Sequence, residues 1–378
     1  MDKVRFGDVV KRVNIYVDRF NTDRLYYVGK GGSIEPDALD IKPQAKIEGA
    51  TIGFKFHFGF EPGHILFMSR CFDQHKAATA TFRGVCSDST YVVETRDNNV
   101  LLQQYLQLVM QTDDFWNWCE EHKSGGVNFL INYSTLETYE FDLPSIEEQK
   151  VLADKLWAAY RVKEAYRQLL STTDDMLKAK FQEMFGDGKY SVRLDSVCEL
   201  FVDGDWIESK DQSIEGIRLV QTGNVGEGIY IDKADKAKYI NEETFKRLNC
   251  TEIFPGDILI SRLPDPIGRA CIIPENLGRT ITAVDCTIIR LKKEKMLQSF
   301  FISNTLTPSY TKQIYSFILG TTRMRISRNN LASIQIACPP IEEQKRFDEI
   351  YTQAEATKAS LRASIEAIDR VIRSLINQ

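Results

Sequence analysis

Two long stretches of the chain carry apolar side chains at steps of three and four residues, a spacing that predicts helices with one narrow packing seam. Each stretch opens on the same pentapeptide, Ile-Glu-Glu-Gln-Lys, at positions 146–150 and again 195 residues later at 341–345. The offset aligns both seams, so the sequence predicts two copies of one plan. The residues expected to pack are Leu152, Leu156, Tyr166, Leu170 and Leu177 in the first helix and Phe347, Tyr351, Leu361, Ile365, Ile368 and Ile372 in the second.

The seams also contain polar positions at matching depths. Lys163 in the first helix corresponds to Lys358 in the second, and small alanines precede both. A buried polar position can fix the register of two packed helices. We therefore expect the two helices to pack against each other at a defined register.

Residues at the helix ends support these boundaries. Ser145 stands three residues before Glu148, which is the spacing of a capping box. The second helix follows Pro339-Pro340, and proline suits a helix start. Gly186 and Gly188 supply a stop, so the first helix is predicted to end at Phe185.

Residues 1–144 read as a mixed α/β domain. Alternating aromatic residues over Ile52–Phe60 predict a strand, and the turn at Pro62 leads into another strand that ends near Ser69. Helical spacing follows over 101–119, and Glu140–Leu143 is strand-like.

Residues 189–340 repeat this order and diverge between the shared landmarks. Val192–Leu194 resembles Val4–Phe6, and the Pro255–Arg262 segment resembles the turn at Pro62 and its strand. We infer one scaffold with two different reading surfaces. The predicted fold is α+β, with domains at 1–144 and 189–340, a helix and linker at 145–188, and a final helix at 341–378.

Charge argues mildly against a simple cationic DNA binder. The 378 residues have a net charge of −5, with −5 in residues 1–144 and +2 in 189–340. Proteins that neutralise DNA phosphates need concentrated lysine and arginine. If this protein binds DNA, its positive charge must be local or supplied by partners.

Composition excludes several other classes. The eight cysteines are scattered singly, without a C-x-x-C pair, so we expect reduced thiols and no metal site. No apolar run reaches the roughly 20 residues of a membrane span, and the N-terminus lacks a signal-peptide pattern. A cytoplasmic protein is expected.

The alternation of domain, Pro-x-Ile-Glu-Glu-Gln-Lys helix, domain and second helix resembles the specificity subunit of type I restriction-modification enzymes over essentially the whole chain. The segments Gly320–Arg323, Pro255–Leu259 and Gln221–Val225 also look like this family's second recognition domain. The first domain departs from the pattern, with Gly125-Gly126 in place of Gly-Thr and His64 in place of the turn aspartate.

The resemblance implies that each variable domain is a target recognition domain that reads one half of a split sequence in double-stranded DNA. The two helices would pack antiparallel as a spacer, giving an internal pseudo-twofold repeat. Two methyltransferase subunits and the restriction subunits would dock on this chain. S-adenosylmethionine, used for adenine-N6 methylation, and ATP with Mg are then expected on the partner subunits, with no cofactor on this chain.

The residues themselves favour a non-catalytic chain. We find no glycine-rich S-adenosylmethionine or nucleotide loop, no Asp/Asn-Pro-Pro-Tyr/Phe motif and no nuclease carboxylate cluster. Asp203-Gly204-Asp205 is a lone acidic turn. Two alternatives stay open: a coiled-coil scaffold whose domains bind proteins, and an enzyme whose site carries no recognisable motif.

Candidate DNA-binding residues are those whose side chains suit base edges and phosphates, namely arginine, lysine, asparagine, glutamine, histidine, serine and threonine in loops. In the second domain they are Gln221, Thr222, Asn224, Ser261, Arg262, Arg269, Thr321, Thr322, Arg323, Arg325 and Arg328. In the first domain they are Arg70, Gln74, His75, Lys76, Ser124 and Asn128.

Overall fold

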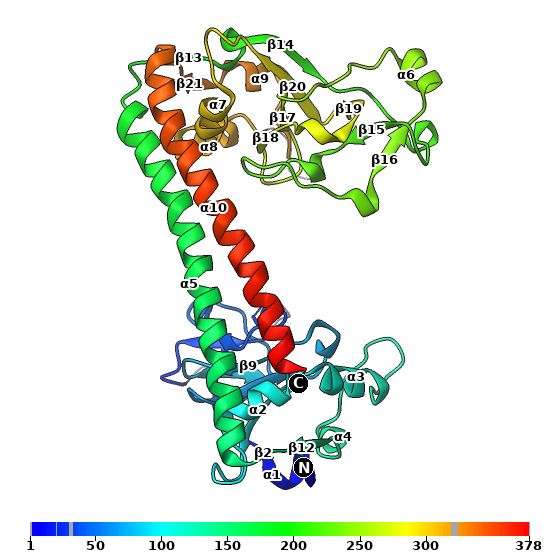
Figure 1. Ribbon diagram of the computed structural model, residues 1–378, viewed down its shortest axis with the longest axis vertical. Helices are drawn as coiled ribbons and strands as arrows, with labels where there is room; N and C mark the ends of the chain where they lie inside the picture. Colours follow the sequence, from blue (N-terminus) through cyan, green and yellow to red (C-terminus); the bar gives the residue numbers. More distant parts are fainter. Residues whose placement is uncertain (1, 20, 30–32, 319–323, 378) are drawn as a thin grey trace. The chain divides into compact units, whose positions relative to one another are not determined.

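The computed structural model describes residues 2–19, 21–29, 33–318 and 324–377 (Figure 1). The chain forms two compact units. Unit 1 comprises residues 1–168 and 362–378, and unit 2 comprises 169–361. Each long helix is divided between the two units. The domain division predicted from the sequence had instead treated each helix as a segment of its own.

The two long helices are α5 (Ile146–Phe185) and α10 (Ile341–Ile376). Helix α5 begins and ends where the capping box and the glycines predicted. The Glu148 carboxylate accepts a hydrogen bond from the Ser145 backbone N–H at 3.0 Å, and the Ser145 hydroxyl accepts one from the Glu148 N–H at 3.3 Å. The capping box therefore forms as predicted.

Unit 1 contains two five-stranded sheets, one two-stranded sheet and short helices. The sheets have the strand orders β3-β7-β10-β4-β6, β2-β11-β8-β9-β5 and β1-β12. The elements are β1 (Asp2–Arg5), α1 (Phe6–Val9), β2 (Val10–Arg12), β3 (Ile15–Tyr16), β4 (Tyr26–Val28), β5 (Asp40–Ile41), β6 (Ala45–Lys46), β7 (Phe56–Phe60), β8 (Ile65–Met68), β9 (Ala77–Ala80), β10 (Gly84–Ser87), β11 (Thr90–Thr95), α2 (Gln103–Val109), α3 (Asp113–Glu121), α4 (Tyr133–Leu136) and β12 (Glu140–Leu143).

Unit 2 has sheets of strand order β14-β20-β17-β18, β16-β15-β19 and β13-β21. Its elements are β13 (Ser191–Arg193), β14 (Cys198–Asp203), β15 (Ile217–Val220), β16 (Lys238–Ile240), α6 (Glu242–Leu248), β17 (Ile258–Ser261), β18 (Ala270–Ile272), β19 (Thr280–Thr282), β20 (Cys286–Leu291), α7 (Gln298–Thr305), α8 (Pro308–Ser316), α9 (Arg328–Ser333) and β21 (Gln335–Ala337).

The internal repeat is visible in the elements that border the long helices. Strand β12 pairs antiparallel with β1, and β21 pairs antiparallel with β13. Helices α2 and α3 correspond to α7 and α8 at the 195-residue offset. One strand prediction was too long: β7 begins only at Phe56, and the Phe54 side chain is 76 % exposed. Alternation of aromatic residues alone therefore overestimated the strand.

The glutamine of each pentapeptide anchors its helix to the domain that precedes it. Gln149 is fully buried, accepts a hydrogen bond from the Leu102 N–H at 2.9 Å and donates to the carbonyls of Val100 and Pro144, both at 2.9 Å. A primary amide offers these donors and acceptor together, and no other side chain of this length does. This explains why the pentapeptide needs glutamine.

The second copy makes the same bonds. Gln344 is also fully buried, accepts from the Leu297 N–H at 2.9 Å and donates to the carbonyls of Lys295 and Pro339 at 2.7 and 2.8 Å. All three partners lie 195 residues after those of Gln149. The repeat thus extends to individual hydrogen bonds.

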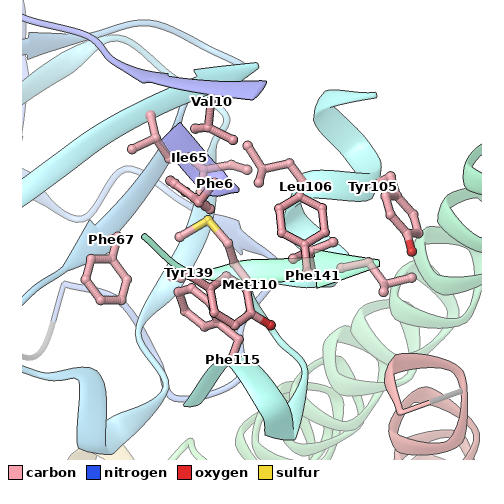
Figure 2. Close-up of a cluster of buried hydrophobic side chains, with 14 of the residues drawn as sticks. Phe6, Val10, Ile65, Phe67, Tyr105, Leu106, Met110, Phe115, Tyr139 and Phe141 are labelled. Atoms are coloured by element: carbon pink, nitrogen blue, oxygen red, sulfur yellow. The ribbon is translucent and has the colours of Figure 1, made fainter. Parts of the chain in front are cut away.

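The core of unit 1 lies between the sheet that contains β8, the short helices and α5 (Figure 2). Phe67, Phe115 and Tyr139 are among its buried aromatics, and Ile372 of α10 packs in the same cluster as Leu156 of α5. The end of α10 therefore packs on the beginning of α5.

The core of unit 2 has an aromatic centre at the helix pair. Phe181 and Phe185 of α5, Phe300 of α7 and Phe347 of α10 have ring centroids 4.9–6.1 Å apart. Here the end of α5 packs on the beginning of α10, so the helices run antiparallel in each unit.

The seam of α10 lies where the spacing placed it: Phe347, Leu361 and Ile372 are buried, and Tyr351, Ile365 and Ile368 are half-buried. The seam of α5 is partly different. Leu156 and Leu177 are buried and Leu152, Tyr166 and Leu170 half-buried, whereas the deeper contacts are made by Ala153, Tyr160, Phe181 and Phe185.

Both seam lysines are buried and paired across the helix pair. Lys163 is 2.5 Å from Asp369 in unit 1, and Lys358 is 2.6 Å from Asp174 in unit 2. Burial lowers the pKa of Lys358, but hydrogen bonds to Asp174 and Glu355 outweigh it, so the pKa lies above its ordinary 10.5. These pairs supply polar contacts that set the register of the two helices.

We predict that Gln149→Ala lowers the free energy of unfolding by about 1–3 kcal/mol, because it leaves a buried N–H and two carbonyls without this partner. Urea unfolding followed by circular dichroism measures the change. Gln353→Ala, at an exposed position of α10, is the matched control and should stay within about 0.5 kcal/mol of the parent. Equal stability of the two variants would refute the anchoring role.

We also predict that Lys358→Ala destabilises the chain by about 1–3 kcal/mol, since it removes a buried aliphatic stem and an ion pair. Lys345→Ala, which removes the exposed pair between Lys345 and Glu342, should cost less than about 1 kcal/mol.

The ion-pair part of this difference should depend on pH. The folded-state pKa of Lys358 is raised above 10.5, so its charge stabilises the fold fully below pH 10.5. The stabilisation is lost as the pH rises through the folded-state pKa. On the alkaline side, the stability gap between parent and Lys358→Ala should therefore narrow only above pH 10.5, and a gap that stays constant through the folded-state pKa would contradict the assignment.

Candidate nucleic-acid interface

In unit 2 the end of strand β17 holds the loop that carries the exposed arginines. The backbone carbonyl of Arg262 accepts a hydrogen bond from the Ile326 N–H at 3.3 Å, and the Arg262 guanidinium donates back to the Ile326 carbonyl at 3.4 Å. The neighbouring Ser327 caps helix α9 by accepting from the Asn330 N–H at 3.1 Å. Arg325 and Arg328 flank these fixed positions.

Unit 1 holds the corresponding loop in the same place with different chemistry. The Ile131 N–H, 195 residues before that of Ile326, donates to the Ser69 carbonyl at the end of β8 at 3.1 Å. The Tyr91 hydroxyl donates to the Ile131 carbonyl at 2.9 Å. A tyrosine therefore does in unit 1 what an arginine does in unit 2.

Two candidate residues of unit 2 are free to meet a ligand. The side chains of Arg325 and Arg328 are exposed, and no ion pair to a described residue involves either of them. Arg325 lies close enough to Arg262 to lower the pKa of that buried guanidinium, after burial itself, which lowers it most. The candidates Thr321, Thr322 and Arg323 lie outside the described residues.

Ser261 and Arg262 require correction, because both are buried. The Ser261 hydroxyl donates to the Leu263 carbonyl at 2.6 Å. Arg262 is 3 % exposed, donates to the Val284 carbonyl at 2.5 Å and lies 3.2 Å from the Asp203 carboxylate. These residues support the loop rather than face a ligand. Arg269 is half-buried, donates to the Ser261 hydroxyl at 3.3 Å and lines a hollow of about 640 Å³.

The predicted Gln221, Thr222 and Asn224 build a turn after β15. The Asn224 side chain accepts from the Gln221 N–H and donates to the Ile231 carbonyl, both at 3.0 Å, so the asparagine amide serves the turn. Gln221 is likewise part of this cap, which leaves Thr222 as the best contact candidate. Sequence reasoning missed Lys233, whose Nζ lies beside Gly223 of the turn; no motif marks it.

In unit 1 the structure exposes Arg70, Gln74 and Asn128. Arg70 directly follows Ser69, so it lies beside the loop end that Ile131 fixes. A backbone bridge between Ser124 and Leu130 closes the loop that carries Asn128. The structure therefore brings Arg70 and this loop to one place.

Of the other three unit 1 candidates, Lys76 requires correction, and His75 and Ser124 are half-buried with internal contacts. Lys76 is 5 % exposed and belongs to the interior. His75 stacks on Trp116 with ring centroids 4.9 Å apart, and its Nδ1 lies 3.0 Å from Asp37. The Ser124 hydroxyl accepts from the Asn132 amide at 3.1 Å. A one-dimensional pattern does not tell a loop surface from the packing beneath it.

The acidic turn that the sequence left without a role is structural. Asp203 pairs with Arg262 and accepts from the Thr287 hydroxyl at 3.0 Å, and Asp205 accepts from the Thr251 N–H at 2.8 Å. A side chain on Gly204 would meet the carbonyls of Thr282 and Ala283 at 2.5 Å. The turn is thus filled by its own contacts.

Among the described residues, no group of three or more His, Cys, Asp or Glu residues could hold a metal ion. No described helix is long and apolar enough to cross a membrane.

Comparison with known proteins defines the class. The family model for the type I restriction modification DNA specificity domain matches residues 187–370, which include most of unit 2. The MjaX type I restriction enzyme specificity subunit of Methanocaldococcus jannaschii is 25 % identical over 262 residues. That alignment covers 65 % of this chain and 60 % of the relative, so the chain matches less than two thirds of that protein's length.

Solved structures agree in fold. A structure described as the basis of complex assembly and conformational transition of the type I R-M system matches 99 % of this chain and 96 % of its own, with a TM-score of 0.57 and 18 % identity. The type I restriction-modification S subunit from M. genitalium matches 99 % and 94 %, with a TM-score of 0.54 and 12 % identity. Residues 187–370 therefore match a type I restriction modification DNA specificity domain, and the chain as a whole has the fold of type I specificity subunits.

We predict opposite behaviour for the two neighbouring arginines. Arg262→Ala should lower the free energy of unfolding by about 3 kcal/mol or more, because it strands the half-buried Asp203 and removes two internal hydrogen bonds. Arg325→Ala should change it by less than about 0.5 kcal/mol, as expected for an exposed side chain. Denaturant unfolding of both variants measures this, and a stable Arg262→Ala chain would restore Arg262 as a surface contact.

Proposed function

We propose that this chain reads a bipartite sequence in double-stranded DNA, with one half read by each unit. The observation that carries the proposal is the pair of corresponding loops, each fixed to the end of a central strand through Ile131 or Ile326. Arg70 and Asn128 accompany the first loop, and Arg325 and Arg328 the second. Arginine suits guanine and phosphate, and asparagine suits adenine.

The divergence between the units supports two different half-sites. The attachments of the loops are shared, whereas the exposed residues and even the supporting side chains, Tyr91 and Arg262, differ. Base contacts specify sequence and phosphate contacts set position. Two related scaffolds with unlike loops are therefore suited to two unlike half-sites.

We further propose that the chain is an assembly hub. Two methyltransferase subunits and the restriction subunits would dock on the paired helices and the domains. The methyltransferases would bind S-adenosylmethionine and methylate one adenine N6 in each half-site, after flipping the base into their own pocket. ATP and Mg would be bound by the restriction subunits. The complex would work in the cytoplasm.

The competing function is a protein-binding scaffold with the same helices. It gives no reason for exposed arginines at corresponding loops of two diverged units. An enzyme with an unrecognised site has no supporting observation among the described residues.

The test is a methylation map. Co-expression of this chain with a candidate methyltransferase partner should place N6-methyladenine at a split motif with an unspecified gap. If methylation is absent, or is unchanged when this chain is deleted, the result would favour the protein-binding scaffold over the DNA reader.

Arg325→Ala with Arg328→Ala should then reduce methylation of target sites about tenfold or more, or relax the motif in one half only. The other half of the motif should stay unchanged. Lys293→Ala with Lys295→Ala is the matched control, because it removes the same charge from the exposed segment after β20. Equal loss in both double variants would indicate a charge effect without readout.

A further inference from the structure

Unit 1 contains a groove of about 1080 Å³ that the proposed reading surface does not use. Helices α2 and α3, strand β12, the first turns of α5 and the last residues of α10 line it. Its apolar lining includes Tyr105, Val109, Trp118 and Val151. Val151 is 52 % exposed, so an apolar side chain faces the opening.

The rim of the groove is acidic and largely unpaired. Asp114, Glu121, Asp142 and Glu147 line it, and no Lys, Arg or His among the described residues lies within ion-pair distance of these four carboxylates. Lys3 is the one cationic side chain among the lining residues. The groove therefore combines an apolar floor with an excess of negative charge.

The remaining carboxylates of the rim already have partners. Asp113 accepts from the Asn377 amide at 2.9 Å, and Glu140 lies 3.2 Å from Arg5. Glu148 belongs to the capping box of α5. The four unpaired carboxylates are thus distinct from those that stabilise the fold.

The second half of the repeat lacks this charge. At the 195-residue offset, Asp114, Glu121 and Asp142 correspond to Ser309, Ser316 and Ala337, and only Glu147 keeps its charge, as Glu342. The feature is therefore not a requirement of the shared scaffold.

The residue of unit 2 that corresponds to Trp118 is Gln313. Its amide donates to the Gln335 carbonyl at 3.0 Å and accepts from the Gln335 N–H at 2.8 Å. These bonds fasten helix α8 to strand β21 in unit 2. In unit 1 the aromatic Trp118 lines the open groove instead.

We propose that this groove binds a basic, partly apolar polypeptide segment of a partner protein, once per chain. Lysine or arginine side chains would meet the four carboxylates, and aliphatic or aromatic side chains would pack on Trp118 and Val151. Charge complementarity gives such a contact its specificity and orientation. DNA is disfavoured there, because phosphates would face an excess of carboxylates. The asymmetry means that this contact distinguishes the two halves of a chain whose helices are otherwise repeated.

The experiment uses the full chain and a defined probe: an amphipathic peptide of lysine and leucine, about 15 residues or four helical turns long. Calorimetry should give one binding site per chain. Neutralising the rim, with Asp114→Asn, Glu121→Gln, Asp142→Asn and Glu147→Gln together, should weaken binding about tenfold or more. Val151→Lys, an exposed single change that places a cation in the groove, should weaken it without affecting the fold.

The matched control neutralises four exposed carboxylates of unit 2, with Glu243→Gln, Glu275→Gln, Glu294→Gln and Glu349→Gln, and should leave peptide binding within about twofold. Equal weakening in the control, two binding sites per chain, or no binding at millimolar peptide would overturn the proposal. The proposal would also be overturned if the chain forms a dimer that the rim variant abolishes and the control variant does not, because the groove would then bind a second copy of the chain. The methylation map should keep its motif in the rim variant, so failure here is separable from failure of DNA reading.

Discussion

The buried glutamine of the repeated pentapeptide is the interaction on which the rest of the structure depends. Gln149 and Gln344 each join the first turn of a long helix to a backbone N–H and two carbonyls of the domain before it. Backbone groups cannot change with sequence, so the contact survives divergence of nearly everything around it. The glutamine also explains why this motif, rather than the apolar seam, is repeated without change.

Beyond this anchor, the two units share the backbone attachment of the loop and differ in the side chains that support it. The loop that carries the candidate contacts is fixed at the same backbone positions in both units, through Ile131 and Ile326. Its second attachment is a neutral tyrosine hydroxyl in unit 1 and a buried guanidinium in unit 2. The buried arginine carries a charge that is paired with the Asp203 carboxylate, whereas the tyrosine needs no counter-ion. The two units thus keep the geometry of the loop attachment and change its chemistry.

The sequence predicted the elements with strong periodic or capping signals. The bounds of α5 and the seam of α10 follow from spacing, capping and the repeat. The predicted seam residues of α5 are buried or half-buried as well, but the prediction missed Tyr160 and Phe181, which pack on the domains, a contact that a heptad pattern does not include. The site was predicted less well. Arg262 and Arg325 are both arginines in loops, and only the fold distinguishes a buried support from an exposed contact.

The placement of the glutamine's partners has a consequence for how such chains can change. Val100, Leu102 and Pro144 all precede Gln149, and Lys295, Leu297 and Pro339 all precede Gln344. A genetic crossover inside one pentapeptide would therefore transfer a whole domain together with the carbonyls that its new helix must meet. Because both pentapeptides have the same five residues, the glutamine of the recombined helix could form the same hydrogen bonds with the new domain. The pentapeptide can thus serve as a junction for domain exchange, at which a chain acquires a new domain in one event.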